Sequence, residues 1–366
     1  MEDIIKEVCD KFRIPGEFSH YEQLKIGNVN KTYRVYFLEP TKSYILQKVN
    51  TFAFRKPIEL MENIDKVTEF IRNKYPDRKA LHFHHTAEVG RPDRKTYFYT
   101  DDGSFWRLFN FIDSDTYNSV ADLKIVRKAG EAFGEFQMSL SDFDPSTLYY
   151  TIPDFHNTPK RYEALEEAVN ADEAGRVKEV KEELDWLFSA KEKACALQKA
   201  DLPIRVTHND TKINNVLFDK QTHDAIVVID LDTVMPGLVA HDFGDAIRSA
   251  ANQVAEDSKE YDKVGINMDI FRAFSEGFLS EVGSILNKEE LETLAISPFI
   301  LSTELAARFL TDYLNGDKYF NIAYPDHNLV RTKNQISLAK DMLKHESEME
   351  QIIREIAGQY SGTQRK

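Results

Sequence analysis

The chain has 366 residues, of which 42% are hydrophobic and 30% are charged, a balance typical of a globular protein with enough apolar material for a core. At about 150 residues per domain, this length favours two domains. Lys and Arg number 47 against 61 Asp and Glu, and the net charge of −14 disfavours nucleic acid or anionic membrane as the main partner. The longest uncharged stretch, residues 293–303, is too short for a membrane-spanning helix, which needs about 20 apolar residues.

Two further features concern the surroundings in which the protein works. The chain opens with Met1-Glu2-Asp3 and lacks the basic segment and apolar run of a secretory signal. The two cysteines, Cys9 and Cys195, lie far apart without metal-ligand spacing, which argues against a disulfide framework or a zinc site. We expect a cytoplasmic protein with no membrane partner, either a monomer or a weak homodimer.

The first third of the chain predicts a small sheet accompanied by helices. Apolar residues at helical spacing predict a helix over residues 4–12. Runs rich in β-branched and aromatic residues predict three strands, at residues 32–38, 43–49 and 95–99. Pro57 begins a second helical pattern. Together these elements predict a small antiparallel-sheet lobe over residues 1–111.

The rest of the chain is mostly helical in pattern. The clearest helices are predicted at residues 123–140 and around 336–356, and a polar stretch at 170–175 is predicted as a turn. One β-like island, residues 214–229, interrupts the helices with two short apolar runs joined by a turn. We therefore predict an α+β fold in which a large, mainly helical lobe, residues 112–366, follows the small one.

The start of this island carries the most informative motif. Protein-kinase catalytic loops follow the pattern H-R-D-x-x-x-x-N. His208, Asp210 and Asn215 keep that spacing, and only the arginine position differs, as Asn209. No complete P-loop, no Gly-x-Gly dinucleotide fingerprint and no Gly-x-Ser-x-Gly nucleophile elbow occurs in the sequence. The motif favours phosphoryl transfer.

Four polar residues in or beside the island have a place in that chemistry. Asp210 is predicted to face the acceptor hydroxyl as the catalytic base. Asn215, and Asp230 at the end of the second apolar run, offer the hard oxygen ligands that Mg²⁺ needs beside nucleotide phosphates. Lys212 is predicted to neutralise charge on the transferred phosphoryl group.

Three longer runs resemble a known superfamily. They are residues 208–215 (HNDTKINN), 230–245 (DLDTVMPGLVAHDFGD) and 308–313 (RFLTDY). The chain resembles the aminoglycoside phosphotransferase and choline kinase superfamily, and within it the N-acetylhexosamine 1-kinases. The resemblance implies a protein-kinase-like two-lobe fold with a nucleotide-binding N-terminal lobe and a catalytic and substrate-binding C-terminal lobe.

The resemblance also assigns the acidic residues. It implies that Asp210 is the base and that Asn215 and Asp230 hold the metal. Asp232 is the rival to Asp230, because it would face the same side of a strand, but the family's metal ligand directly follows the apolar run. Asp242 begins an Asp-Phe-Gly sequence but lies too far downstream of Asn215 to bind the metal. It resembles the family's buried acid that braces the catalytic loop.

In the small lobe the resemblance extends to the nucleotide phosphates. Residues 24–33 resemble the family's strand-turn-strand over the phosphates, so Gly27, Asn28 and Asn30 are predicted to bind nucleotide, although a plain hairpin explains the segment nearly as well. Lys48 fits the phosphate-clamping basic residue of the third strand, and a solvated strand lysine is its alternative.

Two further predictions concern the partner of Lys48 and the hinge. Either Glu59 or Glu62 would pair with Lys48, and the sequence does not choose between them. The hinge between the lobes is expected near residues 109–113, where Phe109 and Phe111 would meet adenine.

The acceptor site rests on fewer residues. Arg308 and Thr233 resemble positions beside the sugar in the hexosamine kinases; the alternative for Arg308 is a helical ion pair with Asp312, four residues on. His156 and Arg161 either line the acceptor site or serve capping and packing.

Together these features predict an ATP- and Mg²⁺-dependent kinase with a small-molecule sugar substrate. The expected acceptor is the anomeric 1-hydroxyl of N-acetylglucosamine or N-acetylgalactosamine. The alternatives are a kinase of the same fold acting on another sugar, choline, ethanolamine or an aminoglycoside, and a catalytically inactive nucleotide-binding protein.

Overall fold

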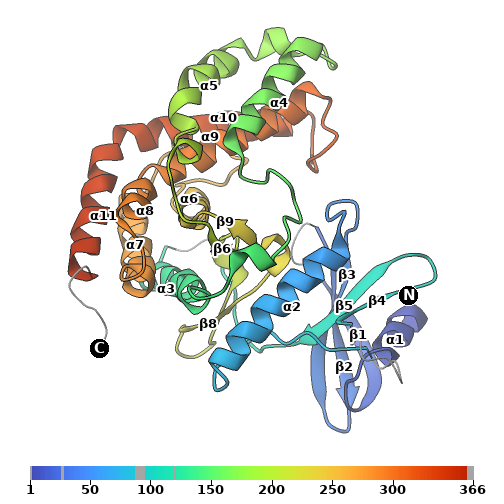
Figure 1. Cartoon of the computed structure of the whole chain (residues 1–366). Helices are drawn as coiled ribbons and strands as arrows, with labels where there is room; N and C mark the ends of the chain where they lie inside the picture. The colour runs from blue at the N-terminus through green and yellow to red at the C-terminus, as the bar shows by residue number, and fades with distance from the viewer. Residues whose placement is uncertain (1, 26–28, 87–94, 119–120, 361–366) are drawn as a thin grey trace.

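The computed structural model describes residues 2–25, 29–86, 95–118 and 121–360. It consists of a small lobe built on a five-stranded sheet and a larger helical lobe (Figure 1). The predicted α+β class, with the sheet lobe first in the chain, is confirmed. The predicted helix at 123–140 and the strands at 32–38 and 43–49 also form, each within one residue of the expected ends.

The sheet of the small lobe is antiparallel throughout. Its strand order is β1 (Glu17–Leu24), β2 (Lys31–Leu38), β3 (Lys42–Val49), β5 (Phe105–Asn110) and β4 (Tyr97–Tyr99). In the pairing of β3 with β5, Gln47 lies opposite Arg107 and Lys48 lies opposite Trp106. Because side chains alternate across a strand, these two pairs point to opposite faces of the sheet.

The two faces of the sheet are covered by different helices. The outer face packs on α1 (Glu2–Asp10), and Leu46 and Trp106 of the sheet share a cluster there with Ile5 and Val8 of the helix. The inner face looks toward α2 (Pro57–Lys74) and the large lobe (Figure 1). Of the strand residues, Val49 and Phe105 belong to the core that is continuous with the large lobe.

Helix α2 is attached to the large lobe as well as to the sheet. Its buried apolar residues share one continuous core with those of the large lobe. At its centre the buried Asn63 side chain donates to the carbonyl oxygens of Tyr149 and Val234 and accepts from the Tyr149 amide. The amide group thus satisfies three backbone groups of the large lobe, which fixes the angle of α2 against it.

The large lobe is a bundle of helices around one long buried helix. The helices are α3 (Leu123–Ser139), α4 (Thr158–Ala171), α5 (Lys181–Ala194), α6 (Val239–Ala250), α7 (Met268–Val282), α8 (Lys288–Leu294), α9 (Ser297–Leu314), α10 (His327–Lys344) and α11 (Glu346–Tyr360). Among the described helices none alone is long and apolar enough to cross a membrane. The bent pair α8 and α9 is, by length and composition only, and α9 is almost entirely buried in this lobe.

Two short strand pairs carry the predicted site. Strand β6 (Arg205–Thr207) pairs with β9 (Met235–Gly237), and β7 (Val216–Phe218) pairs with β8 (Ala225–Val228). The second pair confirms the predicted island. The segment between β6 and β7 contains the motif residues, and a short 3-10 turn, Leu231–Thr233, lies between β8 and β9.

Candidate active site

The loop after β6 is held by a buried carboxylate from the first turn of α6. Asp242 accepts the backbone N–H groups of His208 at 2.9 Å and Asn209 at 2.7 Å, and the Gln137 amide at 2.5 Å. Burial raises the pKa of Asp242, and these donors, together with the nearby His208, act in the opposite direction. The predicted bracing role of Asp242 is confirmed, and it allows Asn209 to hold a left-handed conformation with φ of 64°.

The buried imidazole of His208 connects this loop to the β7–β8 hairpin. Its Nδ1 accepts the Asp210 amide at 3.2 Å, and its Nε2–H donates to the Ile229 carbonyl at 2.8 Å. The Ile229 amide in turn donates to the carbonyl of Asn215 at 2.8 Å. These three bonds bring Asn215 and the residue after Ile229, Asp230, beside the catalytic loop.

Asp210 lies at the centre of the motif residues. The Asn215 amide nitrogen donates to its carbonyl oxygen at 2.8 Å and to its carboxylate at 3.2 Å. Lys212 Nζ lies 2.8 Å from the other carboxylate oxygen, and the negative charges of Asp210 and then Asp245 raise the pKa of Lys212. The Asp210 side chain is 28% exposed, so one edge of the carboxylate remains open to an acceptor.

Asp230 and Asp232 have different environments although they are two residues apart. Asp230 adopts a left-handed conformation with φ of 62° and is exposed to solvent. Even so, desolvation by the surrounding protein atoms raises the pKa of Asp230 to about 7, and the negative charges of Asp232 and Asp210 act in the same direction. The buried Asp232 carboxylate receives Arg107 Nη1 at 2.5 Å and Asn30 Nδ2 at 2.6 Å. Asp230 is therefore the more open carboxylate, as a metal ligand would be.

Lys48 does not join this group in the structure. Its ammonium lies 5.8 Å from the centre of the Trp106 ring, on the sheet face that packs against α1. The inner position of β3 belongs to Gln47, because neighbouring strand residues point to opposite faces. The predicted placement of Lys48 beside the phosphate site is thus contradicted by the register of the sheet.

Neither of the two glutamates proposed for Lys48 contacts it. Glu59 pairs with Lys56 at 2.9 Å, and Glu62 receives a hydrogen bond from the Tyr149 hydroxyl. A buried cation on the inner face is Arg107 of β5, which the sequence analysis did not single out. The sequence signal for this residue is a single arginine within an apolar strand, because a buried charge needs a partner.

The other predicted nucleotide residues are placed in part. Gly27 and Asn28 lie outside the described residues. Asn30 reaches Asp232, as noted above. At the end of β5, the Phe109 ring lies 4.9 Å from that of Phe83, and the Arg34 guanidinium lies 3.7 Å from the centre of the Phe111 ring. Both aromatic residues are half-buried near the expected hinge, and their contact with adenine remains a prediction.

On the other side of the catalytic loop, Arg308 extends from α9 between two aromatic rings. Its guanidinium lies 5.5 Å from the ring centres of Phe155 and Phe320. The alternative pairing with Asp312 is wrong. The Asp312 carboxylate accepts a hydrogen bond from the Asn328 side-chain amide. It also accepts from the backbone N–H groups of Lys318, Tyr319 and Phe320.

One helical turn before Arg308, Glu304 connects α9 to the catalytic loop. It accepts from the Thr158 hydroxyl at 2.7 Å and lies 2.9 Å from His156 Nδ1. The His156 Nε2 atom lies 3.4 Å from the Asn209 carbonyl oxygen. Although burial opposes it, these partners and Arg308 keep the pKa of Glu304 below its ordinary value.

Two other candidates for the acceptor site have structural contacts. The Thr233 hydroxyl donates to the His208 carbonyl at 2.6 Å and so braces the catalytic loop. Arg161 Nη2 donates to the Phe155 carbonyl at 2.9 Å, and burial and the positive charge of Arg308 lower its pKa. The two guanidinium groups are therefore close enough to repel each other.

Residues 20–272 match the model of the phosphotransferase enzyme family. The chain belongs to this family. Its fold is similar to that of a microcompartment-associated aminopropanol kinase, at a TM-score of 0.64 and 15% identity over 95% of this chain and 98% of that one. It is also similar to spectinomycin phosphotransferase in complex with ADP and spectinomycin, at a TM-score of 0.60 and 15% identity over 94% of this chain and 99% of that one. An ethanolamine kinase from Plasmodium vivax has a TM-score of 0.57 and 14% identity over 86% of this chain and 82% of that one. Identities this low show the shared two-lobe fold alone.

In this phosphotransferase the donor set near Asp230 suits magnesium. Asn215 uses its amide nitrogen on Asp210, so its oxygen is the atom left for a cation. Among the described residues, no three acidic, histidine or cysteine side chains form a preassembled metal cluster. Mg²⁺ is commonly held by one or two protein oxygens together with phosphates and waters, so a pair such as Asn215 and Asp230 fits it.

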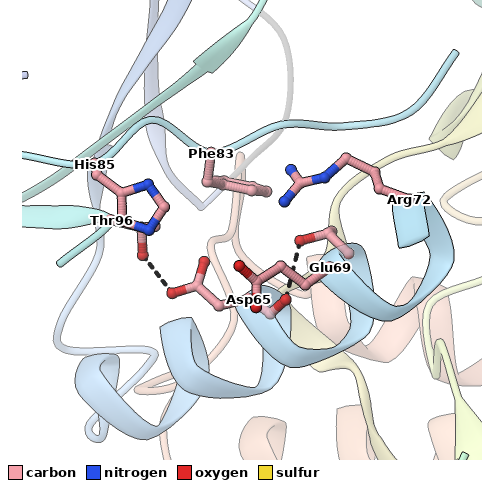
Figure 2. Close-up of a pocket in the computed structure, with 7 residues that line it drawn as sticks. Asp65, Glu69, Arg72, Phe83, His85 and Thr96 are labelled. Carbon is pink, nitrogen blue, oxygen red and sulfur yellow. Dashed lines mark hydrogen bonds between the residues drawn. The ribbon is translucent and has the colours of Figure 1, made fainter. Parts of the chain in front are cut away.

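A separate cavity of about 310 Å³ lies beside α2. Figure 2 shows Asp65, Glu69 and Arg72 rising from α2 toward Phe83 and His85. The Thr96 hydroxyl donates to Asp65 at 2.6 Å, yet burial raises the pKa of Asp65 to about 6. None of the residues predicted for catalysis lines this cavity of the phosphotransferase.

Proposed function

We propose that the protein transfers the γ-phosphoryl group of ATP to the anomeric 1-hydroxyl of an N-acetylhexosamine, in a reaction that requires Mg²⁺. The observation that carries the phosphotransfer is the convergence of Asp210, Asn215 and Asp230 around one loop, each braced through His208 or its neighbours. A relative of the same fold has been crystallised with ADP, which supports a nucleotide as donor.

The residues divide the chemistry between them. Asp210 would orient the 1-hydroxyl and accept its proton as the new P–O bond forms. Lys212 holds the Asp210 carboxylate in place and carries positive charge at the position where the phosphoryl group would pass. Asn215 and Asp230 would hold Mg²⁺, which neutralises phosphate charge when bound. Because phosphoryl transfer needs little covalent catalysis, positioning and charge supply most of the rate.

The charges near the loop favour an uncharged acceptor over a cationic one. Among the described residues Arg308 forms no ion pair, and Glu304, one helical turn away on α9, is engaged by His156 and Thr158. A choline or aminoglycoside cation placed here would meet Arg308 and Arg161. An acetamido carbonyl or ring oxygen would instead accept hydrogen bonds from a guanidinium, which offers five donors.

The test is a comparison of acceptors by ADP release. We expect turnover with N-acetylglucosamine or N-acetylgalactosamine, much weaker turnover with glucosamine, and none with choline or kanamycin. Glucosamine is the matched control, because it differs by one acetyl group and carries a cation. The 1-O-methyl glycoside of the preferred sugar should be inert, since its anomeric oxygen has no proton. Faster turnover of choline or kanamycin would reject the sugar assignment. The absence of ADP release with every acceptor, in a protein that binds Mg-ATP, would reject the phosphotransfer.

A variant at Arg308 tests the acceptor residues directly. Arg308→Lys should raise KM for the sugar markedly while KM for ATP stays within about twofold, because a lysine is a point donor that cannot reproduce the arginine fork. Arg331→Lys is the matched control, since that guanidinium also lies over an aromatic ring, 5.3 Å from the centre of Phe309, on another helix. An unchanged sugar KM in the Arg308 variant would assign the residue to packing alone.

A further inference from the structure

Arg107 is a buried cation in the middle of β5, with only 2% of its surface exposed. Its guanidinium is held on both sides. Nη1 contacts the Asp232 carboxylate at 2.5 Å, while Nε and Nη2 both donate to the Gln47 side-chain oxygen, at 2.9 and 2.7 Å. The Phe83 ring lies alongside, 5.7 Å from the guanidinium carbon. A planar fork fixed at three nitrogens has one orientation, which is what a positioning group requires.

The partner of Arg107 extends the network to two further segments. Asp232 belongs to the short turn after Asp230, and its second carboxylate oxygen accepts from Asn30 Nδ2 at 2.6 Å. The Asn30 side-chain oxygen in turn accepts the Asn50 amide at 2.9 Å. One chain of contacts therefore joins the inner face of the sheet, the start of β2 and the segment that carries the more open aspartate.

The contacts of Arg107 also separate two acidic neighbours. Asp232 is buried and turned toward Arg107 and Asn30, whereas Asp230 is exposed. Without a cation at Arg107, the Asp232 carboxylate would lose its only ion-pair partner among the described residues. Such a buried charge is strongly unfavourable, so the side chain would be expected to move toward solvent, into the space next to Asp230.

We propose that Arg107 is a positioning residue of the Mg-nucleotide site, in the place that the family resemblance gave to Lys48. By holding Asp232 and, through it, Asn30, it orients Asp230 toward the metal and fixes the residue before β2 beside this site. This inference rests on the proposed function, because it assumes that the site binds a magnesium nucleotide.

The experiment measures how much Mg²⁺ improves ADP binding. Calorimetric titration of ADP with Mg²⁺, and of ADP in EDTA, gives two Kd values for each variant, and their ratio reports on the metal site. In Arg107→Met this ratio should fall by about 10–100-fold, the usual effect of losing a group that orients a metal ligand. Arg107→Lys keeps the charge, so the protein should fold even if Arg107→Met does not. It should lower the ratio too, because lysine cannot hold Asp232 and Gln47 together.

Two further variants make the outcome decisive. Lys48→Met removes the residue that the sequence favoured and should leave the ratio unchanged. Lys42→Met, at the exposed start of the same strand, controls for the loss of one positive charge. An unchanged ratio in Arg107→Lys, or a loss in Lys48→Met equal to that in Arg107→Met, overturns the proposal. A wild-type protein that does not bind Mg-ADP would reject the proposed function instead.

Discussion

At the scale of single residues, Asp210 is the side chain whose removal should separate binding from chemistry. Asp210→Asn should lower kcat by about 10²–10⁴, the usual range for losing a general base. The Kd for Mg-ADP should change little, because Asn215 and Asp230 remain. Steady-state kinetics and calorimetry on the same preparation test this, with the exposed Asp201→Asn as the control. Near-normal turnover in Asp210→Asn would remove Asp210 from the mechanism.

Asp65 provides a residue-scale prediction about pH. Burial raises its pKa from 3.8 to about 6, so the folded state holds the proton more tightly than the unfolded chain. The stability from this proton is fully present below about pH 4 and is lost as the pH rises through about 6. Asn is neutral throughout, so Asp65→Asn should be more stable than the wild type at pH 8, by up to about 2 kcal/mol, and the difference should shrink toward pH 5.

Thermal unfolding at several pH values measures this difference. Asp77→Asn, at an exposed position shortly after the same helix, is the control for the loss of one carboxylate. A Tm difference between Asp65→Asn and the wild type that does not vary with pH would show that Asp65 is ionised freely in the folded protein.

At the scale of elements, the contact of α3 with α7 depends on glycine. A Cβ on Gly130 of α3 would lie 2.3 Å from the Phe274 carbonyl oxygen of α7, closer than real atoms approach. The helices must therefore separate to admit any side chain. Gly130→Ala should lower the free energy of unfolding by about 1–3 kcal/mol, the usual effect of overpacking.

Gly358→Ala gives the opposite expectation for the same substitution in a helix. A Cβ at Gly358 of α11 meets nothing within 4 Å, so alanine should stabilise the protein by up to about 1 kcal/mol through helix propensity. Denaturant unfolding of both variants provides the comparison. Equal effects of the two substitutions would contradict the close packing of α3 on α7.

At the scale of the whole molecule, α2 should behave as part of the large lobe. Besides the contacts of Asn63, Lys66 donates to the Thr147 carbonyl at 2.7 Å and Lys74 to the Ser139 carbonyl at 3.1 Å. In amide hydrogen exchange, α2 should therefore show protection like that of α3, and motions of β1 and β2 should leave it in place. Exchange of α2 together with β1 and β2 would contradict this attachment.

Asn63→Ala tests the same attachment by mutation. It leaves three backbone groups of the large lobe, one of them fully buried, without their partner, at a cost of about 1–3 kcal/mol, and should lower the protection of α2. Asn73→Ala, on an exposed position of the same helix, should have little effect. Equal protection in the two variants would show that Asn63 does not hold the helix.

What the sequence determined by itself about this protein is local. The eight residues from His208 to Asn215 already contain the loop geometry, because their spacing sets which backbone and side-chain groups meet. Strands β2 and β3 and helix α3 follow from short-range apolar periodicity. The order of elements, a sheet lobe and then helices, was predictable for the same reason.

The tertiary structure alone decided which side chains meet across these elements. Lys48 and Gln47 are neighbours in the chain, and only the pairing of β3 with β5 shows that Gln47 and Arg107 point inward. Likewise, Asp312 lies one helical turn from Arg308, yet a loop from further along the chain occupies its carboxylate. The contacts of a charged side chain depend on strand register and on partners distant in sequence, because a buried charge needs a partner that only the folded chain brings next to it.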